Sequence, residues 1–342
     1  MLKILQAGRA LAAISVAAYH LSTMMGYDRY GGDAVFYEYT KLGGLGVDFF
    51  FVLSGFIILL AHINDIGKPE AWRTYIYRRF IRLFPIYWLY TALFILLLLL
   101  GTGTTAKIPE SFGDWATALS LIRFTEVSPP ITVAWTLFHE MAFYAVFSIL
   151  ILNYRIGLVT LGIFMLLPVV YFNYPIASER TAFNVYTSAY NLHFLFGMGA
   201  MLIYRLGGRG MVELTIGISL TIFSLATMPL PHESSKLLLT AGFALILAGA
   251  AKLEVSGVLR TPDFLGLIGD ASYTIYLVHI PLQIMLIKIA MSLHLHQIIG
   301  SSATYIVILV GAIALGCLVY LIIERRLLKL LRKKKEQKLI IG

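Results

Sequence analysis

The sequence predicts an all-α, polytopic membrane protein, a bundle of about ten transmembrane helices with both termini in the cytoplasm. Hydrophobic residues make up 59% of the 342 residues and charged residues only 13%, against about 25% charged residues in a soluble domain. The mean hydropathy is +0.82, the apolar residues gather into long runs, and lysine and arginine concentrate on one side of them. These observations exclude a soluble enzyme, a disordered chain and a disulfide-linked scaffold, the last because Cys317 is the single cysteine.

A helix needs about 20 mostly apolar residues to cross a bilayer. Ten segments meet that requirement: 5–25, 44–62, 83–101, 133–153, 156–172, 189–206, 211–228, 236–252, 265–290 and 302–323. Unbroken apolar runs such as 95–100 favour helices over membrane β-strands, which alternate apolar and polar residues. Because Arg9 interrupts the first run, we expect a retained helix there and not a cleaved signal peptide. We expect one membrane-embedded domain, 1–342, that ends in a basic cytoplasmic tail, 325–342.

The distribution of basic residues predicts the orientation of the chain. With the N-terminus in the cytoplasm, 19 of the 27 lysine and arginine residues fall on the cytoplasmic side. Six fall on the opposite side: Arg29, Lys41, Lys107, Arg123, Arg180 and Lys236. Cytoplasmic loops carry such an excess, so we expect both termini inside. The formal net charge of +9 then reflects topology and attraction to anionic membrane lipid, and requires no nucleic-acid partner.

Arg9 and His20 are the polar residues of interest in the first span. They are separated by three helical turns, about 16 Å along the axis, so they lie near one helix face. Ionisable residues are costly inside a membrane, and each is therefore a candidate for function. Arg9 could bind an anion at the inner mouth while His20 works deeper in the membrane. Alternatively, Arg9 extends to the inner interface and His20 bonds a carbonyl group.

The second span and the segment before the third contain a carboxylate and three arginines. Asp48 follows a glycine-rich start to the second span, and a buried carboxylate needs a cationic or hydrogen-bonding partner. Arg79 and Arg82 are three residues apart and share a helix face, with Arg78 beside them. Guanidinium groups bind phosphate through charge-assisted hydrogen bonds. The alternative is a set of arginines that only anchors the inner end of the span.

Two further spans hold polar candidates. Glu140 lies at the start of the fourth span, directly after His139. In the ninth span, Ser272, Tyr276 and His279 recur at intervals that place them on one helix face. They could line a cavity or form hydrogen bonds between packed helices.

The order of these segments carries more information than any one of them. Arg9 and His20 are followed by GVDFFFVLSGF at 46–56, RRFIRLFP at 78–85, WTLFHEMAFY at 135–144 and SYTIYLVH at 272–279. In this order they resemble the acyltransferase-3 family of integral membrane acyltransferases, and within it the branch that decorates exopolysaccharides. The resemblance covers essentially the whole chain.

The resemblance implies a multi-pass O-acetyltransferase in the bacterial inner membrane. Such an enzyme transfers acyl groups other than amino-acyl groups. The donor would be cytoplasmic acetyl-CoA, although succinyl transfer also occurs in the family, and no metal is expected. The acceptor would be a hydroxyl of a glycan or lipid-linked oligosaccharide. Polysaccharide synthesis or export proteins would be partners.

The resemblance also implies roles for individual residues. Arg9 and His20 correspond to the essential pair, with His20 acting as a general base or as an acyl relay. Arg79 and Arg82 correspond to the contacts with the CoA phosphates. Glu140 and Asp48 correspond to the acids of their motifs, and His139 departs from the apolar residue that the family has before the glutamate.

Two other classes of protein remain possible from the sequence. A proton-coupled transporter of a glycan or small anion could use His20, Asp48 and Glu140. An inverted repeat would be expected for it, and RRFIRLFP has no counterpart in the second half of the chain. A scaffold subunit of an export complex would leave the ionisable residues inside the spans unexplained. The sequence therefore favours the enzyme.

Overall fold

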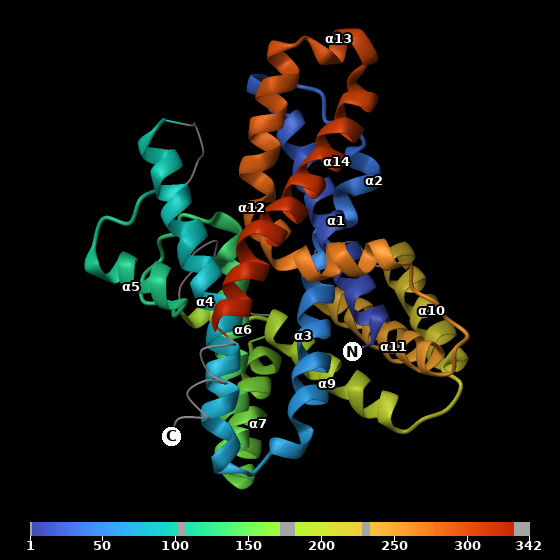
Figure 1. Ribbon diagram of the computed structural model, residues 1–342. Coiled ribbons are helices and arrows are strands. Elements are labelled where there is room, and N and C mark those ends of the chain that lie inside the picture. Colours follow the sequence, from blue (N-terminus) through green and yellow to red (C-terminus); the bar gives the residue numbers. More distant parts are fainter. Residues whose placement is uncertain (1, 102–106, 172–181, 228–232, 332–342) are drawn as a thin grey trace. The chain divides into compact units, whose positions relative to one another are not determined.

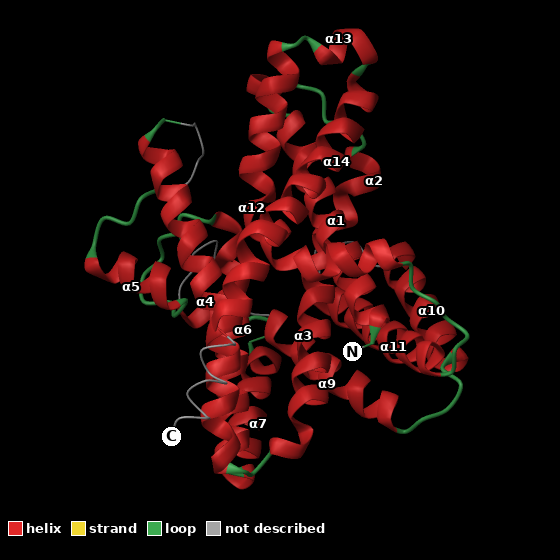
Figure 2. Ribbon diagram, in the orientation of Figure 1, coloured by secondary structure: helices red, strands yellow, loops and turns green. Residues whose placement is uncertain are grey.

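The computed structural model describes residues 2–101, 107–171, 182–227 and 233–331, and within these ranges it contains helices and no strand (Figures 1 and 2). The all-α prediction is confirmed. The longer helices are α1 (Lys3–Met25), α3 (Gly46–His62), α4 (Pro69–Leu99), α6 (Trp135–Leu152), α7 (Tyr154–Val170), α9 (Tyr190–Arg205), α10 (Met211–Thr227), α11 (Glu233–Val255), α12 (Asp263–Ser292) and α14 (Ser301–Val319). The shorter helices are α2 (Tyr37–Thr40), α5 (Phe112–Ser120), α8 (Ala182–Tyr186) and α13 (Leu295–Ile299), together with short 3-10 turns and a π-helical turn, Tyr320–Glu324.

Seven segments of the described chain are long and apolar enough to cross a membrane. They are Lys3–Met25, Tyr37–Asp65, Pro69–Leu99, Thr132–Leu152, Lys236–Val255, Asp263–Ser292 and Ser301–Leu331. Three other predicted spans coincide with shorter helices, α7 and α10 of 17 residues and α9 of 16. The chain is therefore a multi-pass membrane protein. The count of ten spans and the cytoplasmic side of the termini stay predictions.

The contacts between residues divide the chain into two compact units, which we describe separately. The first unit comprises Met1–Leu5, Asp48–Phe80 and Thr91–Arg260, and the second comprises Gln6–Val47, Ile81–Tyr90 and Thr261–Gly342. Of the predicted tail, residues 325–331 belong to the second unit, and residues 332–342 lie outside the described part.

In the first unit, α10 packs along α11, and α6 packs against α7 and α9 (Figure 1). Lys252 of α11 donates to Glu213 of α10 over 2.5 Å, which ties these two helices together at one end. The helices α3 and α9 meet closely at Gly197, where a side-chain Cβ would overlap the backbone oxygen of Val52. A glycine is thus required at this crossing, as it commonly is between membrane helices.

In the second unit, α1, α12 and α14 form one core. Figure 1 shows α12 and α14 side by side, joined through α13. The buried apolar side chains of this core include Leu21, Met24, Ile284, Ile287, Tyr305 and Ile308. The helices α1 and α12 approach closely at Gly269, where a Cβ would overlap the backbone oxygen of Gln6. This close approach brings polar side chains of the two helices within hydrogen-bonding distance.

Candidate active site

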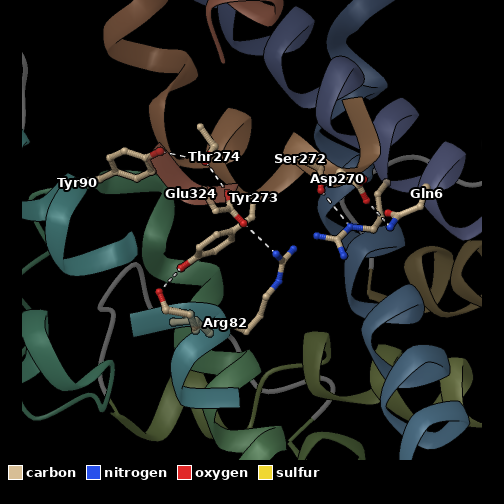
Figure 3. Close-up of polar contacts among 10 residues, drawn as sticks. Gln6, Arg82, Tyr90, Asp270, Ser272, Tyr273, Thr274 and Glu324 are labelled. Carbon is tan, nitrogen blue, oxygen red and sulfur yellow. Dashed lines mark hydrogen bonds and ion pairs between the residues drawn. The ribbon is translucent and has the colours of Figure 1, made fainter. Parts of the chain in front are cut away.

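A line of polar contacts runs between α1 and α12, and we call it the polar seam. Gln6 Nε2 donates to Asp270 Oδ1 over 2.7 Å, and Arg9 Nε donates to Ser272 Oγ over 3.0 Å (Figure 3). Further along both helices, a ring nitrogen of His20 lies 2.8 Å from one of His279. The polar seam consists of these six residues: Gln6, Arg9, His20, Asp270, Ser272 and His279.

Four of the residues predicted from the sequence therefore meet in the polar seam. The pairs occur in the same order along both helices, so α1 and α12 run in the same direction. Ser272 and His279 are each only 1% exposed and face α1, as their spacing on one helix face predicts. Tyr276 lies between them on α12 and is also buried.

The two histidines of the polar seam differ in their surroundings. Their ring planes are inclined by only 12° and their centroids lie 5.1 Å apart, so the two close nitrogens face each other nearly in the plane of the rings. His279 is fully enclosed, and its Nδ1 lies 2.8 Å from the backbone oxygen of Tyr276 and 3.2 Å from that of Ile275. His20 is only partly buried. Of the pair, His20 therefore has the ring with access to a substrate.

A second polar network in the same unit surrounds Glu324. This carboxylate is completely buried and accepts hydrogen bonds from Arg82 over 2.8 Å and from Thr274 over 2.6 Å (Figure 3). The Thr274 hydroxyl also lies 3.0 Å from the Tyr90 hydroxyl, and the Arg82 guanidinium sits over the ring of Tyr273. Each carboxylate oxygen of Glu324 therefore has a partner, and its charge is balanced by Arg82.

Glu324 did not emerge as a candidate from the sequence. It directly follows the tenth predicted span, 302–323. The available signal was a lone acidic residue at the end of an apolar run, just before Arg325. In the structure it is the last residue of the π-helical turn that extends α14. π-helical turns are rare within helices and are frequent at functional sites.

Arg79 belongs to the first unit, and its partners are aromatic. Its guanidinium lies 5.7 Å from the ring centre of Tyr144 and 5.9 Å from that of Tyr75, which is within the range of cation–π attraction. Its buried Nε has no hydrogen-bond acceptor among the described residues. Glu140 accepts a hydrogen bond from the Tyr144 hydroxyl. Tyr144 thus links two of the predicted site residues, Arg79 and Glu140, while Arg78 is exposed on α4.

Asp48 lies at a third polar position, also in the first unit. It is 3% exposed, and its Oδ1 lies 3.5 Å from Nδ1 of His193, a completely buried residue of α9. His193 is a second residue that the sequence analysis did not single out, although its position inside the predicted span 189–206 was an available signal. Neither of its ring nitrogens has a hydrogen-bond partner among the described residues.

The departure from the family pattern at His139 has a local explanation. His139 is buried and lies 3.0 Å from the side-chain oxygen of Asn191, so its Nδ1–H donates there. The rings of Phe51, Trp135 and Tyr190 pack around it. Neighbouring residues of a helix point about 100° apart, and His139 therefore occupies the packed side of α6 while Glu140 bonds Tyr144.

The predicted site residues are divided between the units. The second unit holds Arg9, Arg82, His20, Ser272, Tyr276 and His279, and the first holds Asp48, Arg78, Arg79 and Glu140. Across the described ranges, no three His, Cys, Asp or Glu side chains gather in a way that could hold a metal ion.

Comparison with known proteins identifies the family. The profile of the acyltransferase-3 family, described as an acyltransferase domain, matches residues 2–321. The chain belongs to the acyltransferase-3 family. It is therefore a membrane acyltransferase, and the resemblance seen in the sequence motifs is confirmed. The transporter and scaffold alternatives lack such support.

A curated relative of this acyltransferase is the exopolysaccharide production protein ExoZ of Rhizobium meliloti (strain 1021). The two sequences are 29% identical over 309 residues, which is 84% of this chain and 90% of the relative. No solved structure matches the acyltransferase. The family match includes every site residue predicted from the sequence and stops three residues before Glu324.

Proposed function

We propose that this acyltransferase is an O-acetyltransferase of the bacterial inner membrane. It transfers acetyl from cytoplasmic acetyl-CoA to a hydroxyl of an exopolysaccharide or of its lipid-linked precursor. The observation that carries the proposal is the polar seam, in which Arg9 and His20 of α1 meet Ser272 and His279 of α12 in a chain of this family. The name of the relative ExoZ supports an exopolysaccharide acceptor.

The arginines of α4 suit the negatively charged end of the donor. A CoA nucleotide carries several phosphate charges, and Arg79 keeps an unsatisfied Nε beside two supporting aromatic rings. Arg78 is exposed and adds positive charge. Arg82 already balances Glu324, so it has less to offer a phosphate. We therefore assign the largest share of donor affinity to Arg79.

His20 supplies the proton chemistry in this proposal. As a general base it takes the proton of the acceptor hydroxyl while the oxygen attacks the thioester carbonyl. The carbon–sulfur bond then breaks, and the CoA thiolate takes the proton back from His20, giving CoA and the sugar ester. In the alternative route the imidazole first receives the acyl group and then passes it to the hydroxyl.

Acetyl-CoA binding tests the donor assignment. Radiolabelled acetyl-CoA is titrated onto the purified protein in nanodiscs, for wild type and for Arg79→Ala, Arg82→Ala and Arg73→Ala. Loss of one charge-assisted contact costs about 1.5–3 kcal/mol, or roughly 10–150-fold in Kd, and we expect this for Arg79→Ala. Arg73 is an exposed arginine of the same helix and serves as the matched control. Absence of saturable binding by the folded wild type would remove acetyl-CoA as the donor.

The acetyl content of secreted polysaccharide tests the reaction. A strain lacking the protein is complemented with wild type or with His20→Ala at matched membrane abundance, and ester-linked acetyl is measured on the exported polymer. We expect wild type to restore acetylation and His20→Ala to leave it at the background level. Retention of most acetylation by His20→Ala would contradict the role given to this residue.

A further inference from the structure

We infer that His279 is a positioning residue that holds the proton of neutral His20 on Nδ1, so that Nε2 of His20 carries the reactive lone pair. The assignment of the proton follows from contacts within the polar seam alone. Its consequence for the reaction rests on the proposed function.

His279 Nδ1 faces two backbone carbonyl groups of its own helix. It lies 2.8 Å from the backbone oxygen of Tyr276 and 3.2 Å from that of Ile275. A carbonyl oxygen can only accept a hydrogen bond, so Nδ1 of His279 must carry a proton. These two carbonyls belong to the preceding turn of the same helix, and the arrangement is therefore fixed by α12 itself.

The burial of His279 and the nature of its partners determine its charge. Its side chain is 1% exposed, and none of its hydrogen-bonding partners in the described chain is a carboxylate. A buried imidazolium without a counter-charge is costly, so His279 is neutral. With its proton on Nδ1, its Nε2 has a lone pair and accepts a hydrogen bond.

His279 determines which ring nitrogen of His20 carries the proton. Nδ1 of His20 lies 2.8 Å from Nε2 of His279, which is an acceptor by the preceding argument. Nδ1 of His20 must therefore donate, and in the neutral ring this leaves Nε2 without a proton. Free histidine in water prefers the opposite form, with the proton on Nε2. His279 thus selects the form of His20 that can accept a proton at Nε2.

The consequence for the reaction is a defined path for one proton. As the acceptor oxygen attacks the thioester carbonyl, its proton moves to Nε2 of His20. The resulting imidazolium keeps its Nδ1–H bonded to His279 Nε2, which stabilises the charge. When the carbon–sulfur bond breaks, the CoA thiolate takes the proton from Nε2, and His20 returns to its starting form. In the acyl-relay route the same Nε2 lone pair would attack the thioester.

Nitrogen NMR tests the proton position directly. The protein is labelled with ¹⁵N-histidine in nanodiscs, and the His20 signals are assigned by their loss in His20→Gln. We expect a protonated Nδ1 and an unprotonated Nε2 on His20 in wild type. In His279→Leu we expect the proton to move to Nε2, and in His279→Gln to stay on Nδ1, because the amide oxygen can accept it. The exposed His296→Gln is the control.

A wild-type His20 with its proton on Nε2 would overturn the inference, and so would an unchanged His20 in His279→Leu. The wild-type spectrum decides the question even if His279→Leu does not fold. In acetyl transfer, we expect His279→Leu to lower kcat by about 10²-fold with an unchanged KM for acetyl-CoA, and His279→Gln to restore part of the rate. If wild type transfers no acetyl at all, the proposed function fails, while the spectra still decide the role of His279.

Discussion

For a single charged residue, burial determines how strongly its charge affects the stability of the fold, and Glu324 shows this most clearly. Its carboxylate has no contact with water and depends on Arg82 and Thr274. Removing one partner of a buried ion pair leaves the other charge uncompensated, whereas removing both can be nearly neutral. We therefore expect the pair to contribute more to the specificity of the packing than to its net stability.

Removal of either charge of the pair is expected to destabilise the second unit. We predict that Arg82→Met lowers the free energy of unfolding by about 3–5 kcal/mol, because it leaves the completely buried carboxylate of Glu324 uncompensated. Glu324→Leu should cost less, because the side chain of Arg82 is 29% exposed. The double variant is expected to recover most of that loss. Denaturant unfolding in detergent, followed by tryptophan fluorescence, measures all three. A double variant no more stable than the single ones would contradict this account of Glu324.

Variants of Tyr144 separate the contribution of its ring from that of its hydroxyl to acetyl-CoA binding at Arg79. Tyr144→Phe keeps the ring beneath the guanidinium and removes the hydrogen bond to Glu140, whereas Tyr144→Leu removes both. A cation–π contact contributes about 0.5–2 kcal/mol, so Tyr144→Leu should raise the Kd for acetyl-CoA roughly 2–30-fold. Tyr144→Phe should bind close to wild type. If both variants lose affinity for acetyl-CoA equally, the contribution comes from the Tyr144 hydroxyl and not from its ring.

At the scale of the helix, the polar seam depends on how closely two backbones can approach. The contacts of Gln6 and Arg9 with α12 require the absence of a side chain at Gly269, since a Cβ there would overlap the backbone oxygen of Gln6. The helix also contains Gly266, which faces open space. The two glycines lie one turn apart, so they form a matched pair for testing the role of the close approach.

We expect Gly269→Ala to separate α1 from α12 and to lower both thermal stability and acetyl transfer. Gly266→Ala should leave activity intact and stabilise the helix by up to about 1 kcal/mol, because alanine has the higher helix propensity. Both variants are compared by melting temperature in nanodiscs and by transfer rate. If Gly269→Ala behaves like Gly266→Ala, the polar seam does not depend on this contact.

Helical spacing could predict the faces of the site helices, but not which helices meet. Arg9 and His20, and likewise Ser272 and His279, share a face because of their intervals, and the structure pairs them across α1 and α12. The contact between Arg82 and Glu324 has no such periodic signal in the sequence. The partner of Arg82 is 242 residues away at the end of a π-helical turn, a departure from regular periodicity that composition does not reveal.

The same limit applies to the arginines of α4. Their spacing of three predicts a common face and a joint role, yet Arg79 has tyrosine partners and Arg82 has a buried carboxylate. The spacing of residues along one helix does not indicate which helices pack against it. The sequence therefore indicated which residues are candidates for the site, but not which residues they contact.

For the protein as a whole, the orientation in the membrane that the basic residues predict can be tested. In a Cys317→Ser background, cysteines are introduced at the exposed positions Asp33, between α1 and α2, and Ser256, after α11. A membrane-impermeant maleimide should label Asp33→Cys in intact cells and Ser256→Cys only after permeabilisation. The reverse pattern would place the termini outside the cell.

The π-helical turn at Tyr320–Glu324 makes the length of this part of the chain critical. A π turn contains one more residue than the α turn it replaces, so the residues before and after it belong to two different helical registers. Deleting one residue within the turn would restore a regular helix and rotate Glu324 by about 100° away from Arg82. We therefore expect this segment to tolerate only those insertions and deletions that keep the Glu324 carboxylate in register with Arg82.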